Sequence, residues 1–291
     1  MSLVISKLHH VALLLLLSLS LPVLANRFAN VEINATPLAD NLYMLTGSGG
    51  NMAALVTNTE VVLIDAQYAE LADKINAKLA ELSSGKTLGT LINTHMHGDH
   101  VNGNSALMPK RIVAHANVLK RLSADASFPR AGLPTETFTK QLSLNMNGQK
   151  LRLEYLPPSH TDGDIVVWFE DKNVVHMGDM MFEGRFPFID LNNGGSVRGY
   201  IANVAYVISQ IDDTTKVVPG HGDLTDKAGL QRFHQMMVKT LAQVELQQAK
   251  GLSAEQIVKA GLGEEWKSWH WNFITEERWI NTLLQAEPLT R

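Results

Sequence analysis

The chain has 291 residues, and 45% of them are apolar, which is enough to bury the core of one enzyme-sized domain. Its 25 Lys and Arg residues against 29 Asp and Glu residues give a formal net charge of -4 at pH 7. Because no basic run is long enough to follow a phosphate backbone, nucleic acid is not an expected partner. The sequence contains no cysteine, so disulfide bonds, thiolate metal ligands and thiol nucleophiles are excluded.

Residues 1–25 have the organisation of a secretory signal peptide. A single basic residue, Lys7, precedes the apolar run 11–17, and the segment 23–25 ends in Ala25 with small residues where a signal peptidase reads them. We expect cleavage after Ala25 and a periplasmic or secreted mature chain, 26–291. An uncleaved membrane anchor is the alternative, but the apolar run is shorter than the roughly 20 residues of a spanning helix. No stable membrane insertion is therefore expected after cleavage.

The remaining pattern predicts clusters of strands with helices between them. Expected strands are 42–45, 53–56, 61–64, 87–92, 111–114, 150–155, 165–169, 173–176 and 215–218. Expected helices are 70–82, 197–211, 228–249 and 254–260. This order is compatible with an α/β fold of one continuous domain, in which two mixed sheets face each other with helices outside. Periodicity alone does not choose this layout over other α/β arrangements.

One expected strand, 87–92, runs directly into the segment Thr94-His95-Met96-His97-Gly98-Asp99-His100. His95 and His97 are two residues apart, so in extended backbone they project to the same side and can reach one metal ion. A positive φ at Gly98 would let the chain turn sharply and direct Asp99 and His100 elsewhere. Because one ion cannot easily use all four side chains, the segment predicts two adjacent ions.

Three further segments each place one potential ligand at the end of an apolar strand. His160 comes just before the expected strand 165–169, Asp179 follows the strand 173–176, and His221 follows the strand 215–218. Ligands carried on strand ends belong to a rigid scaffold, which a preorganised metal site requires.

The order His-x-His-x-Asp-His, then His, then Asp after Gly, then Pro-Gly-His-Gly closely resembles the metallo-β-lactamase superfamily. The resemblance extends from Gly49 to His221 and implies an αββα sandwich, like that of class B β-lactamases and glyoxalase II-like hydrolases. It implies a first metal held by His95, His97 and His160, a second held by Asp99, His100 and His221, and a bridging Asp179. Two Zn²⁺ ions are the expected cofactor, with iron or manganese left open by ligand type.

Two such metals sharing a water would lower its pKa and supply hydroxide near neutral pH. Asp99 is a candidate catalytic residue as well as a ligand, because its carboxylate could orient the attacking water and pass on a proton. The loops 47–51 and 184–190 are expected to frame a pocket for a small-molecule substrate. In the second loop, Arg185 could pair with a substrate carboxylate or could be an ordinary solvated arginine.

Other side chains receive structural interpretations. Phe186 and Phe188 are expected to pack in the core, with an apolar wall of the pocket as the alternative. His176 is expected to pack or to support the site from the strand face opposite Asp179. The remaining histidines without a motif are interpreted as structural or surface residues: His115, His234 and His270. The C-terminal tryptophans are expected to pack the last helices on the sandwich, with a substrate-facing role open for one of them: Trp266, Trp269, Trp271 and Trp279.

The resemblance leaves the scissile bond open among a β-lactam, a lactone or ester, and a thioester. Export and a histidine-containing second site fit a β-lactamase, whereas a bridging Asp179 is more typical of glyoxalase II and lactonases. Export counts against a cytosolic glutathione thioester. Two other classes remain as alternatives: an iron-dependent oxidoreductase similar to sulfur dioxygenases, and a non-catalytic metal-binding protein.

Overall fold

The computed structural model describes residues 27–156 and 158–286. The expected signal peptide, 1–25, and its cleavage point therefore lie outside the described residues. A compact unit begins at Val31 and contains every element below, while residues 27–30 belong to a separate unit. No helix in the described ranges is long and apolar enough to cross a membrane.

The first sheet has seven strands in the spatial order of the sequence. They are β1 (Asn34–Ala39), β2 (Leu42–Thr46), β3 (Met52–Val56), β4 (Val61–Ile64), β5 (Leu88–Ile92), β6 (Arg111–His115) and β7 (Glu136–Phe138). The strands from β1 to β4 pair antiparallel, and those from β4 to β7 pair parallel. The sheet is therefore mixed.

The second sheet has six strands in the order β13-β12-β11-β10-β9-β8. They are β8 (Gln141–Met146), β9 (Gln149–Tyr155), β10 (Ile165–Phe169), β11 (Val174–His176), β12 (Lys216–Val218) and β13 (Thr225–Asp226). All neighbours are antiparallel except β11 and β12, which run parallel. Both sheets are mixed, as expected.

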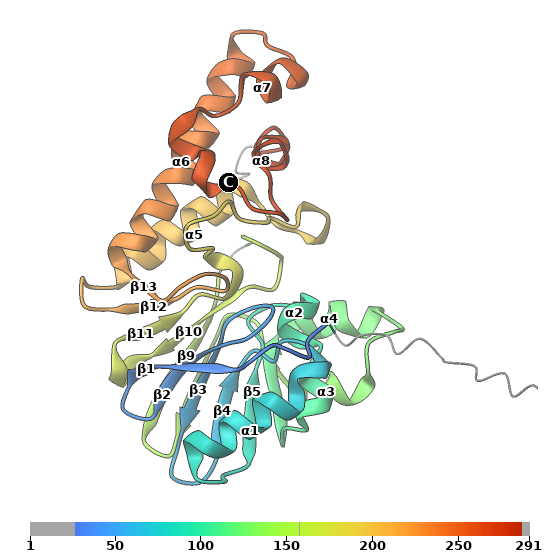
Figure 1. The fold of residues 1–291 in the computed structure, drawn as a ribbon, viewed down its shortest axis with the longest axis vertical. Helices are drawn as coiled ribbons and strands as arrows, with labels where there is room; N and C mark the ends of the chain where they lie inside the picture. Colours follow the sequence, from blue (N-terminus) through green and yellow to red (C-terminus); the bar gives the residue numbers. More distant parts are fainter. Residues whose placement is uncertain (1–26, 157, 287–291) are drawn as a thin grey trace, which may run out of the picture. The chain divides into compact units, whose positions relative to one another are not determined.

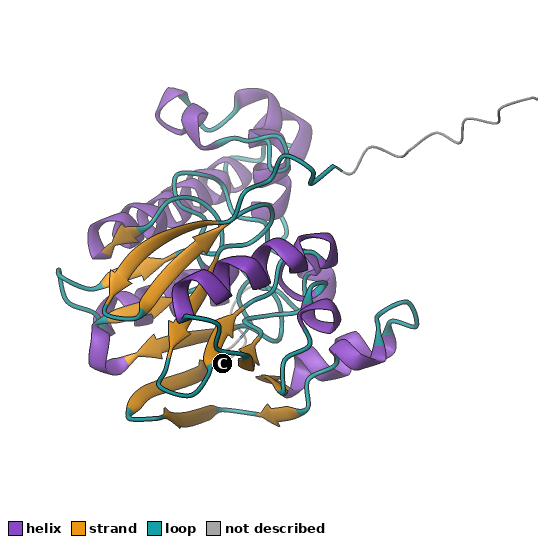
Figure 2. Cartoon of the chain, turned by 60° about the horizontal axis from the view of Figure 1, so that its bottom comes forward, coloured by secondary structure: helices purple, strands orange, loops and turns teal. Residues whose placement is uncertain are grey.

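Helices lie on the outer sides of the two sheets, with α1 beside the first sheet and α5 and α6 beside the second (Figures 1 and 2). The helices of the described residues are α1 (Ala72–Ser83), α2 (Gly98–Val101), α3 (Asn104–Leu107), α4 (Ala116–Ala124), α5 (Val197–Gln210), α6 (Lys227–Ala249), α7 (Ala254–Ala260) and α8 (Glu276–Leu283). The αββα sandwich is thereby confirmed.

Two apolar cores hold these layers together. One lies between the sheets, where alternate residues of facing strands, such as Leu55 and Ile64 opposite Leu153 and Val167, are buried. The other lies between the second sheet and helices α5 to α8, around residues such as Phe233 and Trp279. Side-chain caps fix where these helices begin: Ser196 for α5, Asp226 for α6, Ser253 for α7 and Thr275 for α8.

Every expected strand and helix is present, with ends that differ by one or two residues. Several elements were not expected: the strands β1, β7, β8 and β13, and the helices α2, α3, α4 and α8. Strand β8 could have been predicted, because its sequence, Gln141–Met146, alternates polar and apolar residues as a half-buried strand does.

Candidate metal centre

The seven predicted ligands come together at one edge of the two sheets. In the first sheet, β5 leads to His95, and α2 follows with Asp99 and His100. In the second sheet, the parallel strands β11 and β12 lead to Asp179 and His221 at the same edge. Because β10 runs antiparallel to β11, the loop before β10 also ends at this edge and carries His160.

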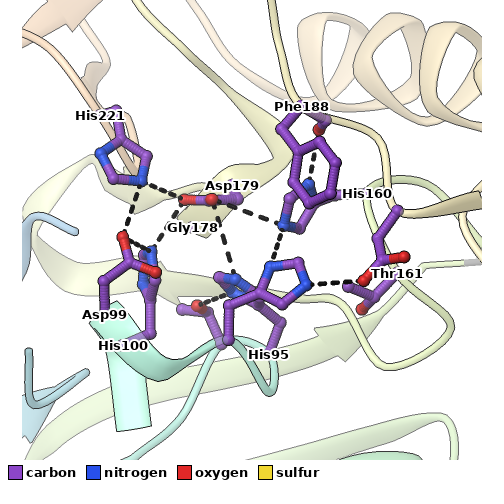
Figure 3. A network of polar contacts seen from close by, with 12 residues as sticks. His95, Asp99, His100, His160, Thr161, Gly178, Asp179, Phe188 and His221 are labelled. Carbon is purple, nitrogen blue, oxygen red and sulfur yellow. Dashed lines mark hydrogen bonds and ion pairs between the residues drawn. The ribbon is translucent and has the colours of Figure 1, made fainter. Parts of the chain in front are cut away.

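These side chains form two groups (Figure 3). In each group, one possible ligand atom from every member lies within 4.8 Å of the others. The first group is His95, His97, His160 and Asp179, and the second is Asp99, His100 and His221. The grouping is the one that the sequence resemblance implies.

Asp179 presents one carboxylate oxygen to each group. Its Oδ2 lies 3.5 Å from Nε2 of His160 and 3.8 Å from Nε2 of His95. Its Oδ1 lies 3.0 Å from Nε2 of His100 and 3.4 Å from Nε2 of His221. A carboxylate so placed can bridge two cations.

In each histidine of the first group, the ring nitrogen that points away from the other ligands has a hydrogen-bond partner. Nε2 of His97 donates to Oδ2 of Asp190 at 2.9 Å, and Nδ1 of His160 donates to the carbonyl of Phe188 at 2.7 Å. Nδ1 of His95 lies 3.0 Å from the Thr94 hydroxyl. Such partners fix the tautomer and direct the free nitrogen of each imidazole to the metal position.

The buried Asp65 is linked by hydrogen bonds to one histidine of each group. Its Oδ2 accepts from the Thr94 hydroxyl at 2.7 Å and from Nδ1 of His100 at 2.8 Å. Because the Thr94 hydroxyl gives its proton to Asp65, it accepts the Nδ1 proton of His95. One buried carboxylate therefore orients a histidine of each group.

The arrangement of lone pairs fits metal ions. With the outer nitrogens of His97 and His160 donating, the inner nitrogens, Nδ1 of His97 and Nε2 of His160, both carry lone pairs and are only 2.7 Å apart. Two facing lone pairs require a proton or a cation between them. Among the described residues, Nε2 of His95, Nε2 of His100 and Oδ1 of Asp179 are buried without a hydrogen-bond partner. All three atoms would be satisfied as metal ligands.

In the metal-free chain, the first group has neutral histidines and the second group has histidines that hold protons. Burial lowers the pKa of His160 to about 3, and of His95 well below its ordinary value, so both imidazoles are neutral and their lone pairs are available. Burial would raise the pKa of Asp179, but His221 and His100 outweigh it and hold this carboxyl ionised. Burial lowers the pKa of His221, yet the Asp179 and Asp99 carboxylates raise it to about 9, and the pKa of His100 is also raised despite burial. A metal ion in the second group would displace these protons and take over the balance of the two carboxylates.

At two positions beside the ligands, only glycine fits, because a Cβ atom would collide with a ligand side chain. A Cβ on Gly220 would lie 2.1 Å from Oδ1 of Asp179, and a Cβ on Gly50 would lie 2.0 Å from the His100 ring. Nδ2 of Asn51 donates to the carbonyls of Pro219 and Gly222, which ties the loop 47–51 to the turn that carries His221.

A cavity of about 510 Å³ opens over the seven ligands. Both expected loops contribute to it, through Gly49 and Phe188, and Asp99, Asp179 and His221 form part of its floor. Its other lining is largely aromatic: Tyr68, Phe182, Phe188, Trp271 and Phe273.

Several expectations about individual residues change. Gly98 does not take a positive φ; it begins α2, so the chain turns by entering a helix. Phe186 is buried in the core, whereas Phe188 packs partly buried against that core and also lines the cavity, as in the alternative of an apolar wall. Arg185 is not among the lining residues, and its guanidinium lies 5.3 Å from the ring centre of Trp271. Its pairing with a substrate carboxylate stays a prediction.

The other histidines and tryptophans have structural contacts. His176 is buried, with Nε2 3.2 Å from the Asn51 carbonyl and Nδ1 accepting from the Gly178 amide. His115 stacks on Tyr155 at 3.8 Å. Trp279 is fully buried in the core, whereas Trp271 lines the cavity and is the tryptophan with a substrate-facing position.

Sequence reasoning missed the supporting roles of Asp65, Thr94 and Asp190. A signal exists for Asp65, because a charged residue directly after the apolar strand β4 is buried only when it has partners. No sequence pattern marks Asp190 or Phe273, since their neighbours in the site lie far away in the chain.

The family model of the metallo-β-lactamase superfamily matches residues 45–230. The chain belongs to this superfamily. It is 25% identical over 202 residues to the metallo-β-lactamase type 2 of Bacteroides fragilis, covering 66% of this chain and 80% of the relative. It is 26% identical over 197 residues to the 2,4-dinitroanisole O-demethylase subunit alpha of Nocardioides sp. (strain JS1661), covering 65% of this chain and 58% of the relative.

Solved structures show the same fold. A metallo-β-lactamase from Pontibacter korlensis has a TM-score of 0.62 at 16% identity and covers 71% of this chain and 99% of its own. The DIM-1 metallo-β-lactamase has a TM-score of 0.61 at 16% identity, and the match covers 72% of this chain and 98% of the DIM-1 chain. Each neighbour is matched almost completely while more than a quarter of this chain is not, so this chain carries structure beyond the shared sandwich.

Proposed function

We propose that the protein is a dinuclear zinc hydrolase that cleaves an acyl C–N, C–O or C–S bond of a small molecule. The observation that carries the proposal is the division of seven donors into two groups that share Asp179, with buried lone pairs directed at two positions. Membership of a superfamily made up mostly of metal-dependent hydrolases supports the reaction class.

Under this proposal, His95, His97 and His160 would hold one zinc, Asp99, His100 and His221 the other, and Asp179 both. Two zinc ions, when bound, would lower the pKa of a shared water towards neutrality and polarise the substrate carbonyl. The donor chemistry of five imidazoles and two carboxylates suits zinc better than magnesium or calcium.

The protein's own contribution is to hold these groups and to move a proton. Asp99 lines the cavity, and its Oδ2 lies 3.3 Å from Nε2 of His221. Burial raises the pKa of Asp99, but His100 and His221 outweigh this and lower it, so the carboxylate is ionised and can accept a proton from the attacking water.

The scissile bond is proposed at the level of an acyl bond, with a β-lactam, a lactone or ester, and a thioester as members. A type 2 metallo-β-lactamase among the relatives supports the first. We also propose that the mature chain begins at Asn26 and works outside the cytoplasm, on the basis of the sequence of residues 1–25.

The test is a hydrolysis assay on purified 26–291 with zinc, using a cephalosporin, a lactone, an ester and a thioester. The proposal expects zinc-dependent turnover of at least one class, with kcat lowered about 10²–10⁴-fold in Asp99→Asn, since the proton acceptor is lost. A fully exposed carboxylate offers a matched control, Glu255→Gln, which should be unchanged. Absence of turnover on all four classes, with iron bound and oxygen consumed, would replace the proposal with the oxidoreductase alternative.

A further inference from the structure

The C-terminal segment after residue 230 lies outside the region matched by the family model, yet part of it reaches the cavity. Helices α6, α7 and α8 pack together and against the second sheet, and the segment between the last 3₁₀ turn (Glu264–Trp269) and α8 carries Trp271 and Phe273. Both side chains line the cavity above the metal ligands.

These two residues complete a continuous row of rings, the aromatic wall, defined as Phe182, Phe188, Trp271 and Phe273. Phe188 lies 5.4 Å from Phe273, Phe273 lies 5.5 Å from Trp271, and Trp271 lies 6.2 Å from Phe182, all between ring centres. One end of the wall contacts the first group, with Phe188 5.6 Å from His97. The other end contacts the second group, with Phe182 stacked 5.0 Å from His221.

The aromatic wall is held in place before any ligand binds. Nε1 of Trp271 donates to the carbonyl of Phe186 at 2.9 Å, and the Phe186 amide donates to the carbonyl of Trp269 at 2.8 Å. The guanidinium of Arg278 donates to the Phe273 carbonyl at 2.8 Å. Phe273 is nevertheless 46% exposed, which is unusual for a phenylalanine and leaves its face open to the cavity.

Two arginines lie on the aromatic wall without lining the cavity. No lysine or arginine is among the described residues that line the cavity. Arg278 lies 4.3 Å from the Phe273 ring centre and 5.1 Å from that of Phe188, and Arg185 lies 5.3 Å from that of Trp271. A substrate group that extends from the metal ligands along the wall therefore meets ring faces first.

We propose that the aromatic wall is an acyl-group subsite, which selects substrates with an uncharged aromatic or medium-length aliphatic substituent next to the scissile carbonyl. The inference rests on the proposed hydrolase function and deepens it by naming the substrate class. Transfer of apolar surface from water onto the rings favours such a group, whereas a carboxylate in the same place would lose hydration and would gain a partner only if Arg185 or Arg278 left its ring contact.

The first test compares matched ethyl esters on the zinc-loaded protein: ethyl acetate, ethyl 3-phenylpropanoate and monoethyl succinate. We expect kcat/KM for the phenylpropanoate to exceed that for the acetate at least about tenfold, and the succinate to be the poorest. Equal values for acetate and phenylpropanoate, or a preference for succinate, would overturn the proposal. The second of these outcomes would point to Arg185 or Arg278 as a carboxylate partner.

The variant Phe273→Ala should lower the phenylpropanoate-to-acetate ratio about fivefold to tenfold, and Phe273→Leu should restore most of it, because an apolar face is regained. The side chain of Phe273 is half-exposed, so neither change should unfold the protein. Leu246→Ala removes a comparably exposed apolar side chain from α6 and should leave the ratio unchanged. A ratio that stays constant in Phe273→Ala contradicts the proposal.

A binding measurement separates failure of the subsite from failure of the hydrolase function. The probe is 4-phenyl-2-butanone, an uncharged ketone that cannot be hydrolysed, with acetone as its small counterpart, and the readout is tryptophan fluorescence. If no cephalosporin, lactone, ester or thioester is cleaved, the proposed function fails, but binding of the phenyl ketone that weakens at least threefold in Phe273→Ala still supports the subsite. No binding of the phenyl ketone to the wild-type chain overturns it.

Discussion

Among single residues, two carboxylates that are not predicted metal ligands, Asp190 and Asp65, orient the histidines of the site by hydrogen bonds. Oδ2 of Asp190 accepts a hydrogen bond from Nε2 of His97 and another from Nδ2 of Asn193, at 2.7 Å. In this chain, His97 keeps its inner nitrogen, Nδ1, free only because the outer nitrogen has this partner. The orientation of one ligand is therefore set by a residue 93 positions away.

Replacing Asp190 with alanine should lower zinc affinity of the first group about 10–100-fold, since His97 loses its orienting acceptor. Competition with a chromogenic chelator measures the effect. Asp212→Ala is the matched control, because Asp212 also organises a turn by accepting from Thr214 and Asn173. An affinity as high in Asp190→Ala as in the control would show that Asp190 does not support the metal.

The change Asp65→Asn should weaken the second group by a similar factor of about 10–100. Asparagine tolerates the positive φ of 62° at this position, so the backbone should be kept. Its amide group, however, accepts at one position only, whereas Asp65 accepts from the Thr94 amide at Oδ1 and from the Thr94 hydroxyl and Nδ1 of His100 at Oδ2. One of these positions would become an NH2 donor, and His100 would lose the charged acceptor that orients it. Calorimetric zinc titration should show one strong site and one weakened site; two unchanged sites would contradict the role assigned to Asp65.

At the scale of elements, the turns after the strands determine how closely the ligands approach. The turn after β12 passes so near Asp179 that a methyl group on Gly220 would collide with its Oδ1. We expect Gly220→Ala to fold, as judged by circular dichroism, but to bind less than one full zinc equivalent in place of two. Gly251→Ala is the control: its Cβ meets nothing within 4 Å, so it should keep its zinc despite the strain of a positive φ.

The C-terminal helices are also a structural requirement. Trp279 of α8 is fully buried, stacks 5.8 Å from Phe186 and donates from Nε1 to Thr240 at 3.1 Å. Trp279→Ala should lower the free energy of unfolding by about 3–5 kcal/mol through the cavity it leaves. Urea denaturation measures this, with Trp279→Phe retaining more of the stability. A loss below about 1 kcal/mol would show that α8 is not part of the core.

At the scale of the whole molecule, the sequence predicts the sandwich and the ligand set but not the surroundings of the site. The ligands lie at strand ends within short motifs, so their order alone identifies them. The alternation of polar and apolar residues in strand β8 was a usable signal, whereas helix α4 is only nine residues long and buries only Val118 and Leu122, which gives a weak helical period. Phe188 and Trp271 were hard to place because an apolar residue gives no sign of whether it faces a core or a cavity.

Calorimetric titration of metal-free 26–291 with zinc measures whether the two donor groups bind two zinc ions. We expect two equivalents per chain, and one equivalent in Asp99→Ala combined with His221→Ala, which removes two of the three donors specific to the second group. A wild-type chain that saturates at one equivalent, or binds no zinc, would show that the two groups do not form a dinuclear zinc site.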